Sequence, residues 1–345
     1  LEGEAALKEA LLTIDRKRTR ELRPYDPAYE LPAGAVPLSD IPALKAGEYS
    51  TGVVAKVSRR WALVDVGSHR GLLPLEEFKW CHNVNPELNF NWFVCKRLDD
   101  MVKQGQQIEV RVVNESENWK KTLGRNFKGP LDYPRLAMEQ DPAPQGALLS
   151  MRVSDGGVLA MVGGSSFAGS EFNRVTQAKR QVGSTFKPLV YAAALDNEEK
   201  PHTPSTILVD APIVEQRVDK EGELWKPGNS GGKYLGDTTF RRGLILSRNI
   251  VTLKILQAIG VKYTLDYMKR FGFKTKLEEN LAMGLGASGL TMRELLRAYT
   301  VFPTLGDRRD PYFISEVRDR DGKILEQTEA GALTEDAMEA STAYV

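Results

Sequence analysis

Apolar residues follow two different spacings along this chain. Between about residues 48 and 115 they alternate with polar residues, which is the spacing of a half-buried strand, in the runs 49–57, 61–67 and 108–113. From residue 184 onward they recur at helical spacing instead, in segments near 184–196, 236–259, 262–271 and 291–302. Strands that precede helices in this way predict an α+β protein with more than one domain.

Proline-rich stretches divide the chain into three predicted parts. Residues 2 to about 22 show an amphipathic helical pattern with basic residues at its C-terminal end, and a proline-rich connector follows. Prolines cluster again between residues 130 and 145. We therefore expect a linker with an N-terminal helix at 1–47, a small barrel domain at 48–129 and a larger domain at 130–345.

Short strands joined by glycine-containing turns are typical of a small β-barrel of the OB or S1 type, and we expect such a barrel at 48–129. A second strand signal opens the larger domain. Apolar runs at 146–153 and 158–164 flank the turn Ser154-Asp155-Gly156-Gly157. An Asp-Gly pair between apolar runs predicts a β-hairpin.

Composition and charge exclude several kinds of function. The formal net charge is +1, so no strong field draws the chain to nucleic acid or to anionic lipid. No apolar run approaches the roughly 18 residues that span a bilayer, and no signal peptide is visible. The first residue is Leu1 rather than methionine, and we interpret both ends of the sequence as cuts in a longer protein.

Cysteine and histidine residues are too scattered for metal or histidine chemistry. Cys81 and Cys95 either form one disulfide or remain free thiols, and the sequence leaves both open. Only His82 lies near them, whereas a zinc site needs two further ligands. His69 and His202 stand alone. We therefore expect no metal and no cofactor.

One motif indicates nucleophilic catalysis. Ser184 and Lys187 are three residues apart and share one face of a helix, within hydrogen-bond reach of each other. Pro188 is tolerated only near a helix start, so it places the helix N-terminus close to Ser184. The positive end of the helix dipole there favours a developing negative charge. A lysine that is partly desolvated in such a pocket can lose its proton and activate the serine.

A second motif, Ser247-Arg248-Asn249, follows Lys187 by sixty residues. Residues two positions apart face opposite sides of a helix, so Ser247 and Asn249 reach one site only where the chain leaves helical geometry. In that case Ser247 can relay a proton to a leaving amine, and Asn249 can hold a substrate amide. The alternative is that Ser247 or Asn249 is an N-cap that opens the helical run 250–256.

Together with their surroundings, the two motifs resemble a known family. S-x-x-K and an S-x-N-type triplet belong to the signature of penicillin-binding proteins and class A β-lactamases. The run 172–191, which contains Ser184, closely resembles the active-site entry of class A penicillin-binding proteins, particularly the type 1A branch. The resemblance spans residues 146–345, through 210–213, 225–229, 247–249, 283–288 and 311–314. The N-terminal helix and the barrel resemble the linker and accessory domain that follow the glycosyltransferase domain in that family.

The resemblance implies a serine β-lactamase-like transpeptidase domain, with helices packed on an antiparallel sheet, that cross-links peptidoglycan. In the family, the serine attacks a terminal D-Ala-D-Ala, releases D-Ala and forms an acyl-enzyme, which an amine of a neighbouring stem peptide resolves. β-Lactams form a lasting adduct with the same serine. The implied catalytic residues are Ser184, Lys187, Ser247 and Asn249. The implied substrate-binding residues are Gly183, Thr185, Asn229 and Arg248. The Ser184 N–H is expected to form half of the oxyanion hole.

The resemblance also implies partners and a location. Stem peptides and β-lactams are the expected ligands, and envelope or cell-wall-synthesis proteins are expected to bind the OB-like barrel. No nucleic-acid partner is expected. The full-length protein is expected to be a glycosyltransferase as well, on the periplasmic face of the bacterial inner membrane. Its single-pass membrane anchor is expected outside this chain.

One family feature is missing from the sequence. No K-T-G triplet follows Ser247, and the only lysine after Lys276 is Lys323. In the family this triplet lies on a strand beside the serine, where its lysine tunes the Ser/Lys proton network and a following N–H completes the oxyanion hole. We interpret the absence as truncation and do not expect residues 1–345 alone to be active.

Two other functions are open at this point. The first is a β-lactam-sensing or β-lactam-hydrolysing relative, against which stands the lack of a glutamate motif like that of the deacylating base in class A β-lactamases. The second is a non-catalytic scaffold or nucleic-acid-binding module centred on the barrel. Its aromatic residues Trp80, Phe90, Trp92 and Phe93 could stack bases, but no dense basic stripe accompanies them.

Overall fold

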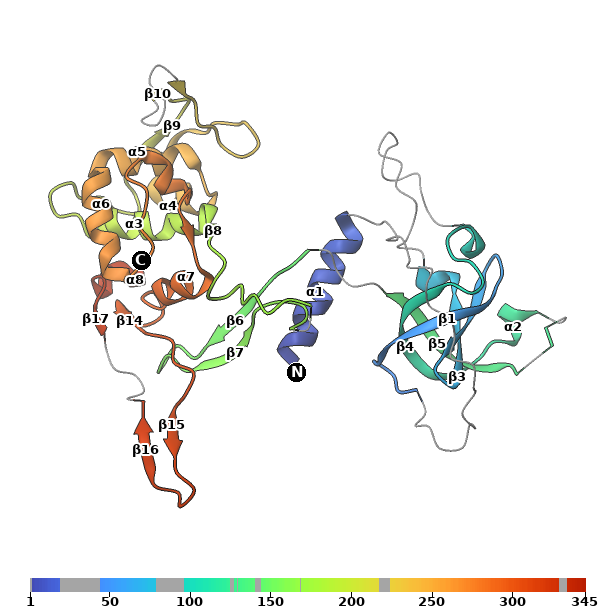
Figure 1. Cartoon of the computed structure of the whole chain (residues 1–345). Helices are drawn as coiled ribbons and strands as arrows, with labels where there is room; N and C mark the ends of the chain where they lie inside the picture. The colour runs from blue at the N-terminus through green and yellow to red at the C-terminus, as the bar shows by residue number, and fades with distance from the viewer. Residues whose placement is uncertain are drawn as a thin grey trace. The chain divides into compact units, whose positions relative to one another are not determined.

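The structure is a computed structural model that describes residues 2–18, 44–78, 96–124, 127–128, 130–139, 144–167, 169–216, 224–328 and 334–345. The chain forms two compact units, and Figure 1 shows both of them. One unit is Lys8–Gln145, and the other is Leu1–Leu7 with Gly146–Val345. Cys81, Cys95 and the aromatic residues at 80–93 lie outside the described residues, so the disulfide and the stacking surface stay predictions.

A closed five-stranded barrel dominates the unit of residues 8–145. Its strands are β1 (Tyr49–Val57), β2 (Trp61–Val66), β3 (His69–Pro74), β4 (Gln107–Asn118) and β5 (Asp132–Glu139), in the order β1-β2-β3-β5-β4. β1 pairs with both β2 and β4, which closes the barrel, and β3 and β5 form a parallel pair. Inward-facing Val54, Val64 and Leu136 are fully buried. The predicted strands at 49–57, 61–67 and 108–113 are confirmed.

The barrel extends past residue 129, where prolines 130 and 134 had suggested its end. β5 pairs with β4 along its whole length, from Asp132 opposite Asn118 to Glu139 opposite Glu109. Trp119 Nε1 donates a hydrogen bond to the Tyr133 carbonyl oxygen at 2.9 Å, inside a second apolar cluster. Pro134 therefore lies within the last strand, and Pro130 lies just before it, rather than in a linker. Short helical turns η1 (Leu75–Phe78), η3 (Leu98–Asp100) and α2 (Lys120–Leu123) join the strands.

The predicted N-terminal helix is present as α1 (Glu2–Arg18), with Leu7, Leu11 and Leu12 buried along it. It is a surface helix by composition, because charged residues separate its apolar positions. Across the part of the chain that the structure describes, no helix has the length and apolarity needed to cross a membrane.

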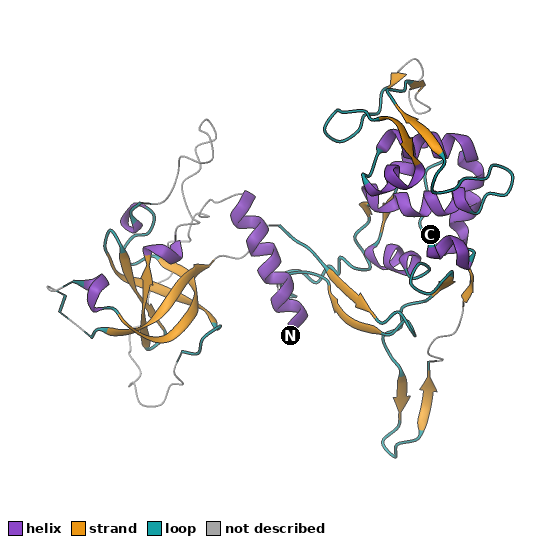
Figure 2. Ribbon diagram, turned by 180° about the vertical axis from the view of Figure 1, so that it is seen from behind, coloured by secondary structure: helices purple, strands orange, loops and turns teal. Residues whose placement is uncertain are grey.

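Helices form the centre of the unit that contains Gly146–Val345, and its strands lie around them (Figure 2). α3 (Lys187–Leu195) packs against α4 (Phe240–Ile245), α5 (Asn249–Ile259) and α6 (Val261–Met268). The contact is largely apolar, and Leu189, Val190, Val251 and Ile255 are fully buried in it. The first helical turn of α3 is thereby fixed by the core behind it. The remaining helices are α7 (Met292–Tyr299), α8 (Ala340–Tyr344) and the turns η4 (Gly183–Phe186), η5 (Lys269–Phe271) and η6 (Leu281–Leu285).

The described strands of this unit form two-stranded antiparallel pairs rather than one large sheet. The hairpin β6 (Leu148–Met151) and β7 (Val158–Val162) confirms the prediction from the Asp-Gly turn. The other pairs are β8 (Arg180–Gln181) with β13 (Gly289–Leu290), β9 (Ile207–Asp210) with β12 (Gly236–Thr239), β10 (Glu215–Gln216) with β11 (Leu224–Trp225), β14 (Asp307–Arg308) with β17 (Thr334–Asp336), and β15 (Glu316–Arg318) with β16 (Ile324–Gln327).

The single helical segment predicted at 236–259 is three elements in the structure. Residues 236–239 form β12, and α4 and α5 are separated at residues 246–248. The break falls on the Ser247-Arg248-Asn249 motif. Because the helix is interrupted at this motif, the break sets the directions in which Ser247 and Asn249 point, and so the geometry of the site.

Candidate active site

Ser184 lies in the tight turn η4, which leads directly into α3 with Pro188 in its first turn. Gly183 has a φ of 57°, in the left-handed region that favours glycine. Its N–H donates a hydrogen bond to the Gly286 carbonyl oxygen at 3.1 Å. A Cβ at residue 286 would clash with the Gly183 backbone, whereas one at residue 183 would meet nothing within 4 Å, so this close approach requires Gly286. The Ser184 side chain is exposed on a backbone that its neighbours hold in place.

Lys187 is one helical turn from Ser184 and is only 1% exposed. Its Nζ donates hydrogen bonds to the Ser247 carbonyl oxygen at 2.7 Å, Ser247 Oγ at 3.0 Å and Asn249 Oδ1 at 2.6 Å. Three acceptors satisfy the three protons of an ammonium group. Among the described residues, none of the hydrogen bonds of Lys187 goes to Ser184. The structure therefore brings Lys187, Ser247 and Asn249 together and places Ser184 beside them.

The S-x-N motif occupies the break between α4 and α5. Ser247 has a φ of 50°, which is uncommon for a residue other than glycine, and Arg248 is extended. This departure from helical geometry lets the Ser247 carbonyl and hydroxyl and the Asn249 amide reach the same amine, as the spacing argument required. The N-cap alternative is wrong. The N-cap position of α5 is Arg248, and no side chain caps the helix there.

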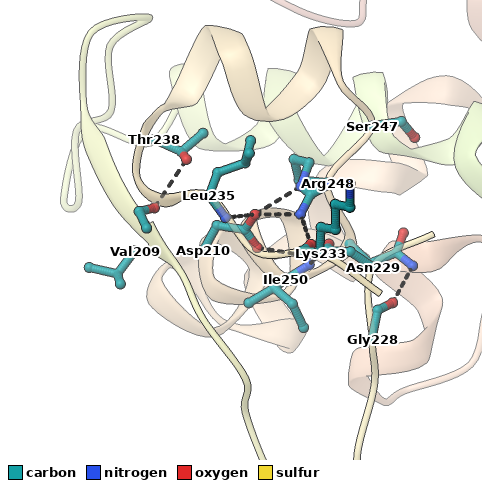
Figure 3. A network of polar contacts seen from close by, with 12 residues as sticks. Val209, Asp210, Gly228, Asn229, Lys233, Leu235, Thr238, Ser247, Arg248 and Ile250 are labelled. Carbon is teal, nitrogen blue, oxygen red and sulfur yellow. Dashed lines mark hydrogen bonds and ion pairs between the residues drawn. The ribbon is translucent and has the colours of Figure 1, made fainter. Parts of the chain in front are cut away.

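A buried polar network fixes the backbone at the break between α4 and α5 (Figure 3). Asp210, at the end of β9, is inaccessible to solvent and accepts a hydrogen bond from Arg248 Nε at 2.8 Å. The other Asp210 oxygen accepts one from Asn229 Nδ2 at 2.7 Å. Asn229 Oδ1 in turn accepts the Ile250 N–H at 3.2 Å. The residues on both sides of Asn249 are thus tied to one carboxylate.

Burial and, to a smaller extent, the nearby positive charge of Arg248 together lower the pKa of Lys187 from its usual 10.5 to about 8. Both effects disfavour the ammonium form, because a charge is poorly solvated in the interior and repelled by a like charge. An amine with such a pKa is partly neutral near pH 7, where an ordinary lysine is almost wholly protonated. Lys187 can therefore accept a proton from a neighbouring hydroxyl.

The predicted substrate-binding residues divide into two groups. Gly183 and Thr185 flank Ser184, and Thr185 Oγ1 donates a hydrogen bond to the Val182 carbonyl oxygen at 2.6 Å. Asn229 and Arg248 instead direct their polar atoms into the protein. The Arg248 guanidinium binds Asp210 and the Lys233 carbonyl oxygen. These contacts assign Asn229 and Arg248 to the frame of the site rather than to its open face.

Sequence reasoning assigned no role to three residues that this geometry uses. Asp210 lies within a run that carried only the family resemblance, and its one local signal is its place at the end of an apolar strand. The Gly228 carbonyl oxygen accepts a hydrogen bond from Asn249 Nδ2 at 2.8 Å. The Tyr299 hydroxyl donates to the Thr185 carbonyl oxygen at 2.5 Å. Both contacts join residues far apart in sequence, so no local pattern reveals them. Within the described ranges, no cluster of residues could hold a metal ion.

Residues 146–344 match the family model of the penicillin-binding protein transpeptidase domain. The chain belongs to this family. Penicillin-binding protein 1A of Neisseria lactamica is 42% identical over 215 residues, which cover 61% of this chain and 27% of that protein. Penicillin-binding protein 1A of Pseudomonas aeruginosa is 36% identical over 250 residues, or 66% of this chain and 29% of that protein. The chain thus spans less than a third of the length of these curated relatives.

Solved structures extend the likeness to the barrel. The crystal structure of penicillin-binding protein 1A from Haemophilus influenzae has a TM-score of 0.72 at 28% identity and covers 95% of this chain and 44% of that one. Penicillin-binding protein A from M. tuberculosis, in its imipenem acyl-enzyme complex, has a TM-score of 0.50 at 18% identity and covers 58% of this chain and 55% of that one. The second likeness concerns the transpeptidase fold alone.

Proposed function

We propose that residues 146–345 carry the acyl-transfer site of a peptidoglycan D,D-transpeptidase, with Ser184 as nucleophile and Lys187 as general base. The observation that carries the proposal is the state of Lys187. It is an almost inaccessible amine with a pKa of about 8, one helical turn from an exposed serine. Lysines on ordinary surfaces cannot serve as bases at neutral pH, whereas desolvated lysines can.

In the first step, Ser184 Oγ bonds to the carbonyl carbon of the penultimate D-Ala, and its proton passes to Lys187 Nζ. The bond from that carbon to the nitrogen of the terminal D-Ala then breaks, and the nitrogen takes up a proton as D-Ala leaves. Ser247 Oγ lies 3.0 Å from Lys187 Nζ and is placed to relay that proton. An amine of a second stem peptide then displaces Ser184 from the acyl group and restores its hydroxyl. Hydrogen bonds to a nucleophile are often longer in a free enzyme than in its substrate complex, so the missing Ser184–Lys187 bond is consistent with this role.

Asn249 and the turn at Ser184 have supporting roles in this proposal. Asn249 Oδ1 holds Lys187 at 2.6 Å, and its position beside Ser247 suits contact with a substrate amide. The Ser184 N–H, at the start of the turn into α3, would contribute to an oxyanion hole. Thr185 and Gly183 flank the serine on the open side and would contact substrate. Gly183 is suited to this position because it has no side chain.

For the other unit, we propose an OB-type barrel that binds envelope or cell-wall-synthesis proteins. The barrel is supported by the closed five-stranded order β1-β2-β3-β5-β4 and by the coverage of 95% of this chain by the H. influenzae structure, and its protein partners are inferred from the family resemblance alone. We extend the proposal to the longer protein: a glycosyltransferase that is also a transpeptidase, anchored on the periplasmic face of the inner membrane. The support for that extension is the relatives named penicillin-binding protein 1A.

Intact-mass spectrometry after incubation with penicillin tests the transpeptidase proposal. The samples are this chain and a longer form that continues past Val345 through the K-T-G strand of the family. A lasting adduct that peptide mapping locates on Ser184 supports the proposal. A folded protein without an adduct in either sample would refute it.

Penicillin turnover and oligonucleotide binding, measured on the same samples, separate the two alternative functions. Rapid loss of a penicilloyl adduct, with steady hydrolysis of penicillin, would identify a β-lactam-hydrolysing relative. Salt-dependent oligonucleotide binding without any adduct would identify a nucleic-acid-binding module. The buried Lys187 favours an acyl-transfer site over a nucleic-acid-binding module. The relatives named penicillin-binding protein 1A favour a transpeptidase over a β-lactam-hydrolysing relative.

A further inference from the structure

Asp210 is the most deeply buried carboxylate near the proposed site, and it lies outside the S-x-x-K and S-x-N motifs. Its relative exposure is 0%, although isolated buried carboxylates are costly and normally paired. It is at the end of β9, where Asp210 pairs with Gly236 of β12. The carboxylate points toward the segment before α5 (Figure 3).

Each oxygen of Asp210 binds a different part of the frame. Oδ2 accepts hydrogen bonds from Arg248 Nε at 2.8 Å and from the Leu235 N–H at 3.1 Å. Oδ1 accepts one from Asn229 Nδ2 at 2.7 Å, and Asn229 passes the restraint on to the Ile250 N–H. Arg248 and Ile250 are the two neighbours of Asn249, so one carboxylate fixes the chain on both sides of that residue.

Asn249 itself is held at both ends of its amide. Its Nδ2 donates to the Gly228 carbonyl oxygen at 2.8 Å, next to Asn229, and its Oδ1 accepts from Lys187 at 2.6 Å. Ser247, on the other side of Arg248, has the left-handed φ of 50°, a conformation that persists only where the surroundings impose it. The backbone here is held by the hydrogen bonds from the Ser247 N–H to the Leu244 carbonyl oxygen at 2.9 Å and from the Arg248 N–H to the Gly243 carbonyl oxygen at 2.8 Å, and the Arg248 side chain adds its contact with Asp210.

We propose that Asp210 is a positioning residue for this site: its carboxylate anchors Arg248 directly and Ile250 through Asn229, and so holds Ser247 and Asn249 against Lys187. The proposal rests on the proposed function for its catalytic consequence, but the anchoring itself does not. Asp210 touches neither Ser184 nor Lys187 in any described contact, so it acts through Arg248 and, by way of Asn229, through Ile250.

The charged groups around Lys187 determine how its pKa would change if Asp210 were replaced. Arg248, in the loop between α4 and α5, lowers the pKa of Lys187. Tyr191, one turn further along α3, stays neutral below about pH 11, because burial raises its pKa to about 12. Loss of the Asp210 charge by itself would lower the pKa of Lys187, since a negative charge stabilises the ammonium group. Release of Arg248 and entry of water would raise it instead.

The test compares Asp210→Asn, Arg248→Gln and the double variant with the unmodified chain. The pKa of Lys187 is read from NMR of ¹³Cε-labelled lysine, with the Lys187 signal assigned by its loss in Lys187→Met. We expect Asp210→Asn to raise this pKa by roughly one unit. The double variant should match Arg248→Gln, because Arg248 carries the charge that shifts the pKa of Lys187, whereas Asn229 is neutral. A fall or no change in Asp210→Asn, or additive effects in the double variant, would overturn the proposal.

The double variant also protects the test against misfolding, because it leaves no unpaired charge buried. Asp196→Asn is the matched control: it removes a partly buried carboxylate that accepts a hydrogen bond from Tyr267 and has no described contact with Arg248. We expect the Lys187 pKa to be unchanged in this control.

The rate of penicillin acylation, measured in the longer form of the protein, tests the catalytic consequence of the proposal. A rise of one unit in the pKa reduces the neutral fraction of Lys187 at pH 7, and so the rate, by about tenfold. If the unmodified protein is not acylated, the proposed function fails, while the NMR result still decides the role of Asp210.

Discussion

The pH dependence of acylation follows directly from the burial of Lys187. With a pKa of about 8, the neutral amine makes up roughly 1% of the protein at pH 6, about 9% at pH 7 and about half at pH 8. A lysine with the ordinary pKa of 10.5 would be only ~0.03% neutral at pH 7, about 300-fold less. The surroundings of Lys187 therefore account for a factor of about 300 in the available base.

The expected profile has a steep limb and a plateau. If Lys187 must be neutral to accept the Ser184 proton, the acylation rate rises about tenfold from pH 6 to pH 7 and less than twofold from pH 8 to pH 9. The sign follows from the direction of the shift, since a lowered pKa makes the base available at lower pH. The steep limb should vanish in a folded Lys187→Met variant, whose acylation should be slow at every pH.

The assay is the rate of fluorescent-penicillin incorporation into the longer form that contains the K-T-G strand, between pH 5.5 and pH 9.5 at constant ionic strength. Ser184→Ala gives the background, and circular dichroism at each pH confirms that the fold persists. A flat profile, or a midpoint near pH 10, would refute the assignment of Lys187 as the base. A normal profile in Lys187→Met would refute it independently.

Four further outcomes are expected. Ser184→Ala should abolish the penicillin adduct in the mass spectrum and leave the thermal melting curve unchanged; a surviving adduct would exclude Ser184 as nucleophile. Gly286→Ala should destabilise the site, because its Cβ would clash with the Gly183 backbone, and acylation should fall at least tenfold; wild-type rates would contradict this packing. Leu136→Ala should lower the free energy of unfolding of the barrel by about 2–5 kcal/mol, since Leu136 is fully buried, and urea titration measures this. Because the pKa of Lys187 is lower in the folded state than in the unfolded state, the free energy of unfolding should rise with pH between about 8 and 10.5, by at most about 3 kcal/mol. Lys187→Met should flatten this rise, which denaturation at several pH values measures.

Local patterns in the sequence predicted the secondary-structure elements and led to the proposal of Ser184 as the nucleophile. The alternation at 49–57 and 61–67 specified strands, because a half-buried strand needs an apolar side chain at every second position. Asp155-Gly156 specified the β6–β7 hairpin, and Pro188 specified a helix start next to Ser184. Each of these is a rule about neighbours along the chain, so no knowledge of distant residues was required.

The tertiary structure alone decided what surrounds Lys187. The periodicity at 236–259 predicted one helix, and only packing against α3 and β9 interrupts it at Ser247, where the left-handed backbone turns three acceptors toward one amine. The prolines at 130 and 134 indicated a linker, whereas pairing with β4 draws that segment into the barrel as β5. Asp210, Asn229 and Arg248 are separated by 19 residues at each step, yet they form one buried network. Such contacts depend on how the whole chain folds, because desolvation and charge act through space rather than along the sequence.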